Sequence, residues 1–125
     1  MQNRALEREA IVGGSKGGVK AAISIQVSVA RRFLARARGL LGRPAPLPGQ
    51  GLWLEPCGQV HTLGMRYPID VVTLAATGEV LAIETLAPWR VGRRIAGAAS
   101  VVELAAGEAA RLGLVVGEKP CLLVA

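Results

Sequence analysis

The fold class is decided by residues 69–87, which read IDVVTLAATGEVLAIETLA. Two runs rich in valine, leucine and isoleucine, Ile69 to Ala75 and Glu79 to Ala87, flank the tripeptide Ala76-Thr77-Gly78. Aliphatic and β-branched residues favour strands, and glycine adopts the left-handed backbone of a tight turn at little cost. This stretch therefore predicts a β-hairpin, and with it a β-rich domain.

Further strand patterns lie on both sides of this hairpin. Residues 23–29 alternate apolar with polar side chains, which is typical of a half-buried strand. Shorter apolar runs predict additional strands at 51–54, 60–63, 101–104 and 121–124.

Two helices are expected beside the strands. From Arg31 the apolar spacing becomes helical and ends at Gly42, which predicts a helix over about residues 31–42. Gly39 is unfavourable inside a helix, and a close approach of another chain segment would explain it. Gly107 to Leu112 predicts a short helix that stops at Gly113. The fold class is therefore mainly β: a small barrel or sandwich of about seven short strands, with one helix near the start and one short helix near the end.

Composition agrees with one folded domain of 125 residues. Hydrophobic residues make up 51% and charged residues 19%, which excludes general disorder. The net charge of +6 is concentrated near the start, because residues 1–43 hold nine basic and two acidic side chains. Residues 44–125, with six basic and seven acidic side chains, are nearly neutral. We therefore expect at most weak, non-specific contact with nucleic acid or acidic lipid, through the basic N-terminal third.

Residues 1–20 are predicted to be a flexible basic tail, and residues 21–125 a single β-rich domain. The tail contains Gly13-Gly14-Ser15-Lys16-Gly17-Gly18, which lacks the Gly-Lys-Ser/Thr ending of a phosphate-binding loop. No apolar run approaches the roughly 20 residues that span a bilayer, and the start mixes acids with bases unlike a secretory signal. We therefore expect no membrane span and a cytoplasmic location, with Cys57 and Cys121 as free thiols.

Scarce polar residues gather in the segment from Cys57 to Asp70, which holds the single histidine, His61, and the single aspartate. Strand alternation would place His61 and Met65 on one face. Cys57, His61 and Met65 are weak candidates for a soft-metal site, because their spacing matches no zinc pattern.

Glu103 stands among apolar neighbours further along the chain. It either lies on the polar face of its strand or is paired internally, with Arg36 or Arg43 as partner. Around Trp89, a basic loop of arginines is expected to be solvated or to form a basic patch.

The chain resembles the family of uncharacterised proteins known as domain of unknown function 192, or DUF192. The resemblance covers about residues 27–124. It rests on the runs Arg36 to Arg43, Gly51 to Leu54, Val60 to Val72, Pro88 to Arg90 and Val102 to Leu104. Its most specific part is the His-Thr-x-Gly-Met-Arg-x-Pro-Ile-Asp pattern at residues 61–70. The resemblance implies a small β-rich barrel or sandwich with a helix near its start, and no known activity or cofactor; some relatives are exported.

A non-catalytic binding or accessory module is the function we expect, with no cofactor and with an unidentified small ligand or protein as partner. Its polar pocket would lie around His61, Thr62, Met65 and Asp70, with Arg36, Arg43 and Glu103 as neighbours. Two alternatives use the same segment: an enzyme that depends on a Cys57 thiolate and His61, and a protein that binds a soft metal.

Overall fold

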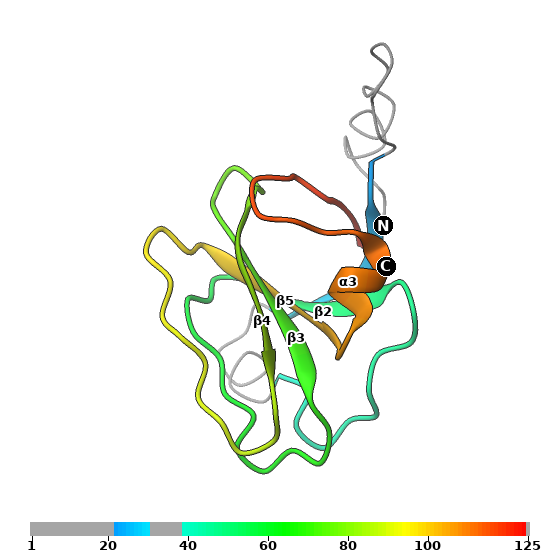
Figure 1. The fold of residues 1–125 in the computed structure, drawn as a ribbon, viewed down its shortest axis with the longest axis vertical. Coiled ribbons are helices and arrows are strands. Elements are labelled where there is room, and N and C mark those ends of the chain that lie inside the picture. Colours follow the sequence, from blue (N-terminus) through cyan, green and yellow to red (C-terminus); the bar gives the residue numbers. More distant parts are fainter. Residues whose placement is uncertain (1–21, 31–38, 125) are drawn as a thin grey trace.

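The computed structural model describes residues 22–30 and 39–124, which form one six-stranded mixed sheet with a short helix near the C-terminus (Figure 1). The elements in chain order are β1 (Ser24–Ala30), β2 (Gln50–Leu54), β3 (Ile69–Leu74), β4 (Val80–Leu86), β5 (Ser100–Ala105), α3 (Glu108–Leu112) and β6 (Cys121–Val124). The expected β-rich fold is confirmed, and the short helix lies where Gly107 and Gly113 predicted it.

The strands are ordered β4-β3-β5-β2-β1-β6. The predicted hairpin forms β3 and β4, and β5 then pairs antiparallel with both β3 and β2. β1 is parallel to β2 on one side and to β6 on the other. Nearly every residue of β3 and β5 is buried, because both faces of these central strands are covered.

Two core clusters lie on opposite faces of the sheet. Because side chains alternate along a strand, neighbouring residues of β3 and β5 contribute to different clusters. We call the first core cluster Ile25, Val27, Val72, Leu74, Val80, Val102, Leu104, Ala109, Leu114 and Leu122. The second core cluster comprises Ala30, Leu40, Leu52, Leu54, Val60, Met65, Ile69, Val71, Leu86 and Val101.

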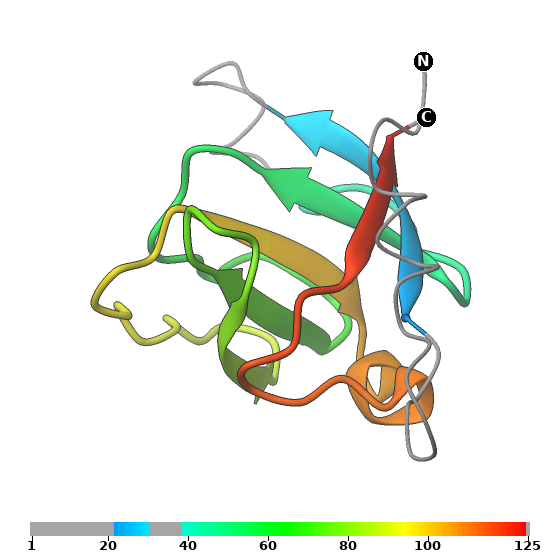
Figure 2. The same ribbon diagram turned by 90° about the horizontal axis from the view of Figure 1, so that it is seen from above.

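The expectation of a closed barrel or a two-sheet sandwich is wrong, because the structure has one open sheet. The sheet nevertheless curls, since Val80 of edge strand β4 and Leu122 of edge strand β6 share the first core cluster. Figure 2 shows the connection from α3 to β6 passing close to β4. In this connection the N–H of Gly117 donates to the carbonyl oxygen of Val80, and the N–H of Val80 donates to that of Glu118, at 2.8 Å each. These bonds join β4 to the segment before β6, although the two edge strands do not pair directly.

Two local expectations also need correction. The segment 60–63 is no strand; its pairing is limited to a single bridge between His61 and Val91. Of the helix expected over 31–42, residues 31–38 lie outside the described part of the chain, and residues 39–42 form a turn. Gly39 and Gly42 adopt left-handed backbones in this turn, with φ of 52° and 76°, which a continuing helix does not allow.

Gly51, in the middle of the sheet, leaves no room for a side chain. A Cβ atom there would lie 2.7 Å from Leu104 Cδ2 and 2.9 Å from the carbonyl oxygen of Glu103. We expect Gly51→Ala to lower the free energy of unfolding by about 1–3 kcal/mol, because β2 and β5 must separate. Urea denaturation measures this. Gly58→Ala is the matched control, because its Cβ would meet only ordinary contacts at 3.8 Å or more. Equal losses in the two variants would contradict this account of β2–β5 packing.

Candidate functional site

A buried carboxylate, Glu103, lies at the centre of the sheet. It stands on β5 between Leu52 of β2 and Val71 of β3, and its side chain shares their face, that of the second core cluster. Only 3% of the residue is exposed. The backbone N–H of Leu40 donates a hydrogen bond to the carboxylate, whereas Oε1 is buried without a hydrogen-bond partner among residues 22–30 and 39–124. Within this part of the chain Glu103 therefore carries an unused acceptor, which is uncommon and costly.

Burial raises the pKa of Glu103 to about 7, because a carboxylate loses its hydration there. The hydrogen bond from Leu40 opposes this shift only in part. Of the two expected internal partners, Arg36 lies outside the described residues, and Arg43 is exposed and forms no ion pair with Glu103. Near neutral pH the side chain is consequently divided between its charged and its uncharged form.

Gly39 allows the turn of residues 39–42 to cover this carboxylate closely. A Cβ atom on Gly39 would lie 3.1 Å from Glu103 Oε1, and the φ of 52° also disfavours any other residue. The glycine that interrupts the predicted helix therefore serves a close approach, as its place in the sequence suggested. The neighbouring Leu40 supplies both the backbone donor for Glu103 and a side chain in the second core cluster.

Tyr67 also holds the turn of residues 39–42 in place. Its hydroxyl donates to the carbonyl oxygen of Arg43 at 2.7 Å and lies 3.4 Å from that of Leu40. Burial raises the pKa of Tyr67, the negative charge of Glu103 raises it further, and Arg43 lowers it. Sequence reasoning did not assign a role to Tyr67, although it stands within the specific pattern at residues 61–70.

A cleft of about 490 Å³ separates residues 40–43 from residues 64–67. Its polar lining is basic, from the exposed Arg43 and Arg66, together with Tyr67, and its apolar lining includes Leu40 and Met65. We call it the Arg43–Arg66 cleft. A second cleft of about 550 Å³, between β1, β2 and residues 43–47, also has Leu40 and Arg43 in its lining. Both volumes are in the range of small-molecule sites.

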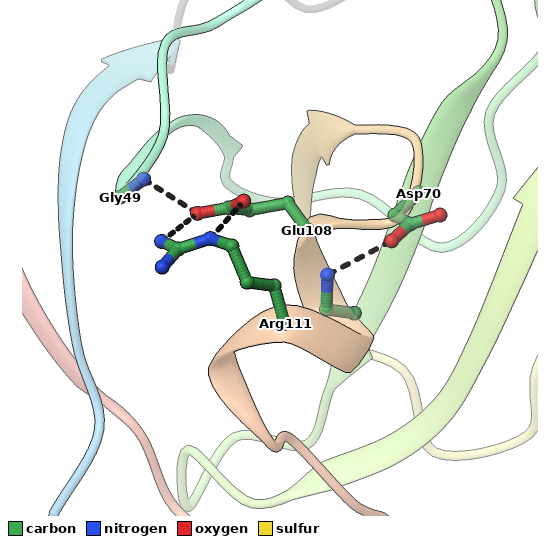
Figure 3. Close-up of polar contacts among 5 residues, drawn as sticks. Gly49, Asp70, Glu108 and Arg111 are labelled. Atoms are coloured by element: carbon green, nitrogen blue, oxygen red, sulfur yellow. Dashed lines mark hydrogen bonds and ion pairs between the residues drawn. The ribbon is translucent and has the colours of Figure 1, made fainter.

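Asp70 lies on the opposite face of the sheet from Glu103, and its bonds are structural. Figure 3 shows its carboxylate oriented toward the first turn of α3, where Oδ2 accepts the N–H of Ala109 at 2.9 Å. Oδ1 accepts the hydroxyl of Thr85 at 2.7 Å. A carboxylate at a helix start satisfies a backbone donor that has no partner within the helix. The structure therefore gives Asp70 the role of holding α3 against β3, away from the Arg43–Arg66 cleft.

A second carboxylate holds α3 to the loop before β2. Glu108 Oε2 accepts the backbone N–H of Gly49 at 2.6 Å, while Arg111 donates to both carboxylate oxygens (Figure 3). The hydrogen bond from Arg111 holds the pKa of Glu108 below its usual range. No sequence signal assigned this contact, because Gly49 and Glu108 are 59 residues apart.

Thr62 and His61 also lie outside the cleft lining. Thr62 is buried, and its hydroxyl bonds to the backbone of residues 87–90. It donates to Ala87 O at 2.6 Å and accepts from Arg90 N at 2.8 Å. The exposed His61 accepts the N–H of Leu63 at its Nδ1. Of the expected pocket residues, Arg43 and Met65 therefore line the same cleft. Glu103 is hydrogen-bonded to the backbone of Leu40, which also lines that cleft.

The residues considered for a soft metal have other surroundings. Cys57 Sγ donates to the carbonyl oxygen of Gln59 at 3.4 Å, and Met65 is only 5% exposed within the second core cluster. Across residues 22–30 and 39–124, no three His, Cys, Asp or Glu side chains are grouped to hold a metal ion. Neither Cys57 nor Cys121 forms a disulfide within the described part of the chain. No helix in the same part of the chain is long and apolar enough to cross a membrane.

Comparison with known proteins gives a family but no activity. The sequence model of the DUF192 family, described as Uncharacterized ACR, matches residues 16–120. A structure from Sinorhizobium meliloti 1021, described as a candidate transcription regulator, is 26% identical with a TM-score of 0.64; the match covers 74% of this chain and 78% of that one. A protein of unknown function from Novosphingobium aromaticivorans DSM 12444 is 25% identical with a TM-score of 0.66, over 74% and 71% of the two chains. No curated protein matches the sequence significantly.

Glu103→Gln is expected to remove a pH dependence of stability. Because folding raises the pKa of Glu103 from 4.5 to about 7, the folded state holds this proton to higher pH than the unfolded chain does. The stabilisation is complete below pH 4.5 and is lost as the pH rises through about 7, a change of about 3 kcal/mol. Urea denaturation of wild type and Glu103→Gln across this window should show the decline in wild type alone.

The exposed Glu79→Gln is the matched control for this measurement, because it makes the same chemical change outside the core. It should leave the wild-type curve intact. Parallel curves for wild type and Glu103→Gln would contradict the assignment of the pH dependence to Glu103.

Proposed function

This chain belongs to the DUF192 family, and we propose that it is a non-catalytic binding module that holds a small amphipathic anion in the Arg43–Arg66 cleft. The observation that carries the proposal is the lining of this cleft. Two exposed guanidinium groups stand beside the apolar side chains of Leu40, Leu41 and Met65, and no acidic residue of the described part of the chain lines the cleft. Guanidinium groups bind carboxylate and phosphate through paired hydrogen bonds, and an apolar wall accommodates the rest of such a ligand.

Glu103 affects the charge near this site, and Tyr67 affects the position of its backbone. With a pKa of about 7, the Glu103 carboxylate beside Leu40 repels an anion less at neutral pH than a fully ionised carboxylate would. Tyr67 holds the backbone of Arg43 in place through its 2.7 Å hydrogen bond. The two arginines are therefore carried by segments whose backbones are braced before a ligand arrives, which lowers the entropic cost of binding.

Binding is favoured over catalysis by the same lining. Among the described residues, no serine, threonine, cysteine, histidine or acidic side chain lines the cleft, so these residues offer it no conventional nucleophile and no carboxylate or imidazole base. Cys57 and His61, the pair on which an enzyme would rely, do not line the cleft. Cys57 Sγ donates to the carbonyl oxygen of Gln59, and the His61 imidazole accepts the N–H of Leu63.

Octanoate is a suitable probe, because it joins a carboxylate to an apolar chain. We expect it to shift backbone amide resonances of residues 40–43 and 64–67 in a ¹⁵N titration. Arg43→Gln and Arg66→Gln should each weaken binding about tenfold, the effect of one lost charge-assisted hydrogen bond. Both side chains are exposed, so neither change threatens folding.

The controls are octylamine, whose charge is reversed, and Arg93→Gln, which alters an exposed arginine outside the cleft. Octylamine should not bind, and Arg93→Gln should bind octanoate like wild type. Octanoate binding that ignores Arg43 and Arg66, or that shifts resonances elsewhere, would contradict this site.

Weak contact with nucleic acid is the second candidate function. The support is the charge of +7 over residues 1–43, of which only a part lies in the described structure, and the name of the relative from Sinorhizobium meliloti 1021. The nearly neutral residues 44–125 offer no matching basic surface of comparable charge. Such contact would be non-specific and would depend on phosphate neutralisation.

A gel-shift titration of duplex DNA at low and high salt tests this second candidate. We expect weak binding that is lost at high salt and reduced when residues 2–20 are deleted, because the deletion removes Arg4, Arg8, Lys16 and Lys20 against two glutamates. Tight binding that persists at high salt, or that prefers one sequence, would contradict both this reading and the binding-module proposal.

A further inference from the structure

Trp89 is the most unusual residue on the surface of the described structure. Its side chain is 64% exposed, and its backbone has a φ of 65°, which makes it the one residue other than glycine with a positive φ in that part of the chain. A bulky residue in this region is strained, and such strain persists only where the surrounding structure enforces it. A tryptophan held outward at a cost in stability calls for a role other than folding.

The buried Thr62 enforces this conformation. Its carbonyl oxygen accepts the N–H of Trp89 at 2.9 Å, and its hydroxyl accepts the N–H of Arg90 at 2.8 Å. The same hydroxyl donates to Ala87 O, and the N–H of Thr62 donates to Arg90 O at 2.8 Å. Residues 87–90 are thus tied on both sides of Trp89, so the ring is presented from a rigid backbone.

The residues that follow are braced in the same way. Gly92 donates to Val60 O at 2.8 Å and accepts from the amide of Gln59 at 2.9 Å. A side chain on Gly92 would be tightly packed, because a Cβ atom would lie 3.2 Å from both Leu86 Cδ1 and Val60 O. In Figure 1 the loops of residues 55–68 and 87–99 run together on the side of the molecule away from the labelled termini.

The backbone segments next to Trp89 carry exposed apolar and basic residues. Val91 is 61% exposed and pairs through its backbone with His61, and Leu63 is also exposed. Arg90 and Arg93 are exposed, and residues 87–102 contain three arginines and no acid. Glu84 borders this region, where it accepts the N–H of Arg93. We call Leu63, Trp89, Arg90, Val91 and Arg93 the Trp89 surface.

We propose that the Trp89 surface docks an acidic peptide segment of a partner protein, with an apolar or aromatic residue of that segment packed on the indole ring. Tryptophan and arginine are the residues that most often dominate protein interfaces. The local excess of positive charge selects acidic side chains for the flanks of the segment. The braced backbone means that the surface needs little reordering when the segment binds. This site shares no residue with the Arg43–Arg66 cleft.

The experiment is a selection of random twelve-residue peptides displayed on phage against the full chain, with fluorescence anisotropy of the enriched peptides. We expect enrichment of peptides that combine aspartate or glutamate with an aromatic or large aliphatic residue. Trp89→Gly and the double change Arg90→Glu with Arg93→Glu should each weaken their binding at least tenfold. Glycine relieves the positive φ, so the melting temperature of Trp89→Gly should not fall below that of wild type.

Matched controls test whether the effects are specific to this surface or follow from changing any exposed apolar or charged side chain. Leu47→Gly removes another large exposed apolar side chain, and Lys119→Glu reverses another charge; both should bind the peptides like wild type. The proposal would be overturned by no enrichment, by enriched peptides without acidic residues, by binding kept in Trp89→Gly, or by a melting temperature of Trp89→Gly well below that of wild type. Self-association of wild type that Trp89→Gly abolishes would also overturn it, since a second copy would then be the occupant.

Discussion

The burial of the Glu103 carboxylate beneath the turn of residues 39–42 is the constraint on which one face of the molecule depends. The carboxylate takes the backbone N–H of Leu40, and Gly39 permits the approach. Once the turn is held there, Leu40 enters the second core cluster and Tyr67 can bond to the Arg43 backbone. A polar group inside an apolar core is costly, so its presence indicates a need for this particular geometry over maximal stability.

On the face of the first core cluster, the carboxylates have structural roles. Asp70 and Glu108 are fully engaged: one caps the start of α3, and the other joins the helix to Gly49 and Arg111. Their oxygens are satisfied, so they organise the fold without being left for a ligand. Both Asp70 oxygens accept hydrogen bonds, whereas Glu103 Oε1 has no partner among the described residues. This difference fits a structural role for Asp70 and the proposed supporting role of Glu103.

Much of the strand content was predictable from local pattern. The alternation at 23–29 became β1, the runs at 69–75 and 79–87 became β3 and β4, and Gly113 ended the short helix as expected. The run at 60–63 failed as a strand because Thr62 spends its hydrogen bonds on the loop before Val91. A local residue pattern can favour a strand, but it does not determine which backbone the segment pairs with.

The β-rich class, the hairpin, the family and the concentration of scarce polar residues from Cys57 to Asp70 follow from the amino-acid sequence alone, because they depend on neighbouring residues and local propensity. Two features required the folded structure: Asp70 and Glu103 face opposite sides of one open sheet, and Arg43 and Met65 share a cleft with Tyr67. Strand order and register carry that information, and they depend on contacts between residues far apart in the chain. Local pattern cannot encode such contacts, because the same alternation is compatible with several pairings.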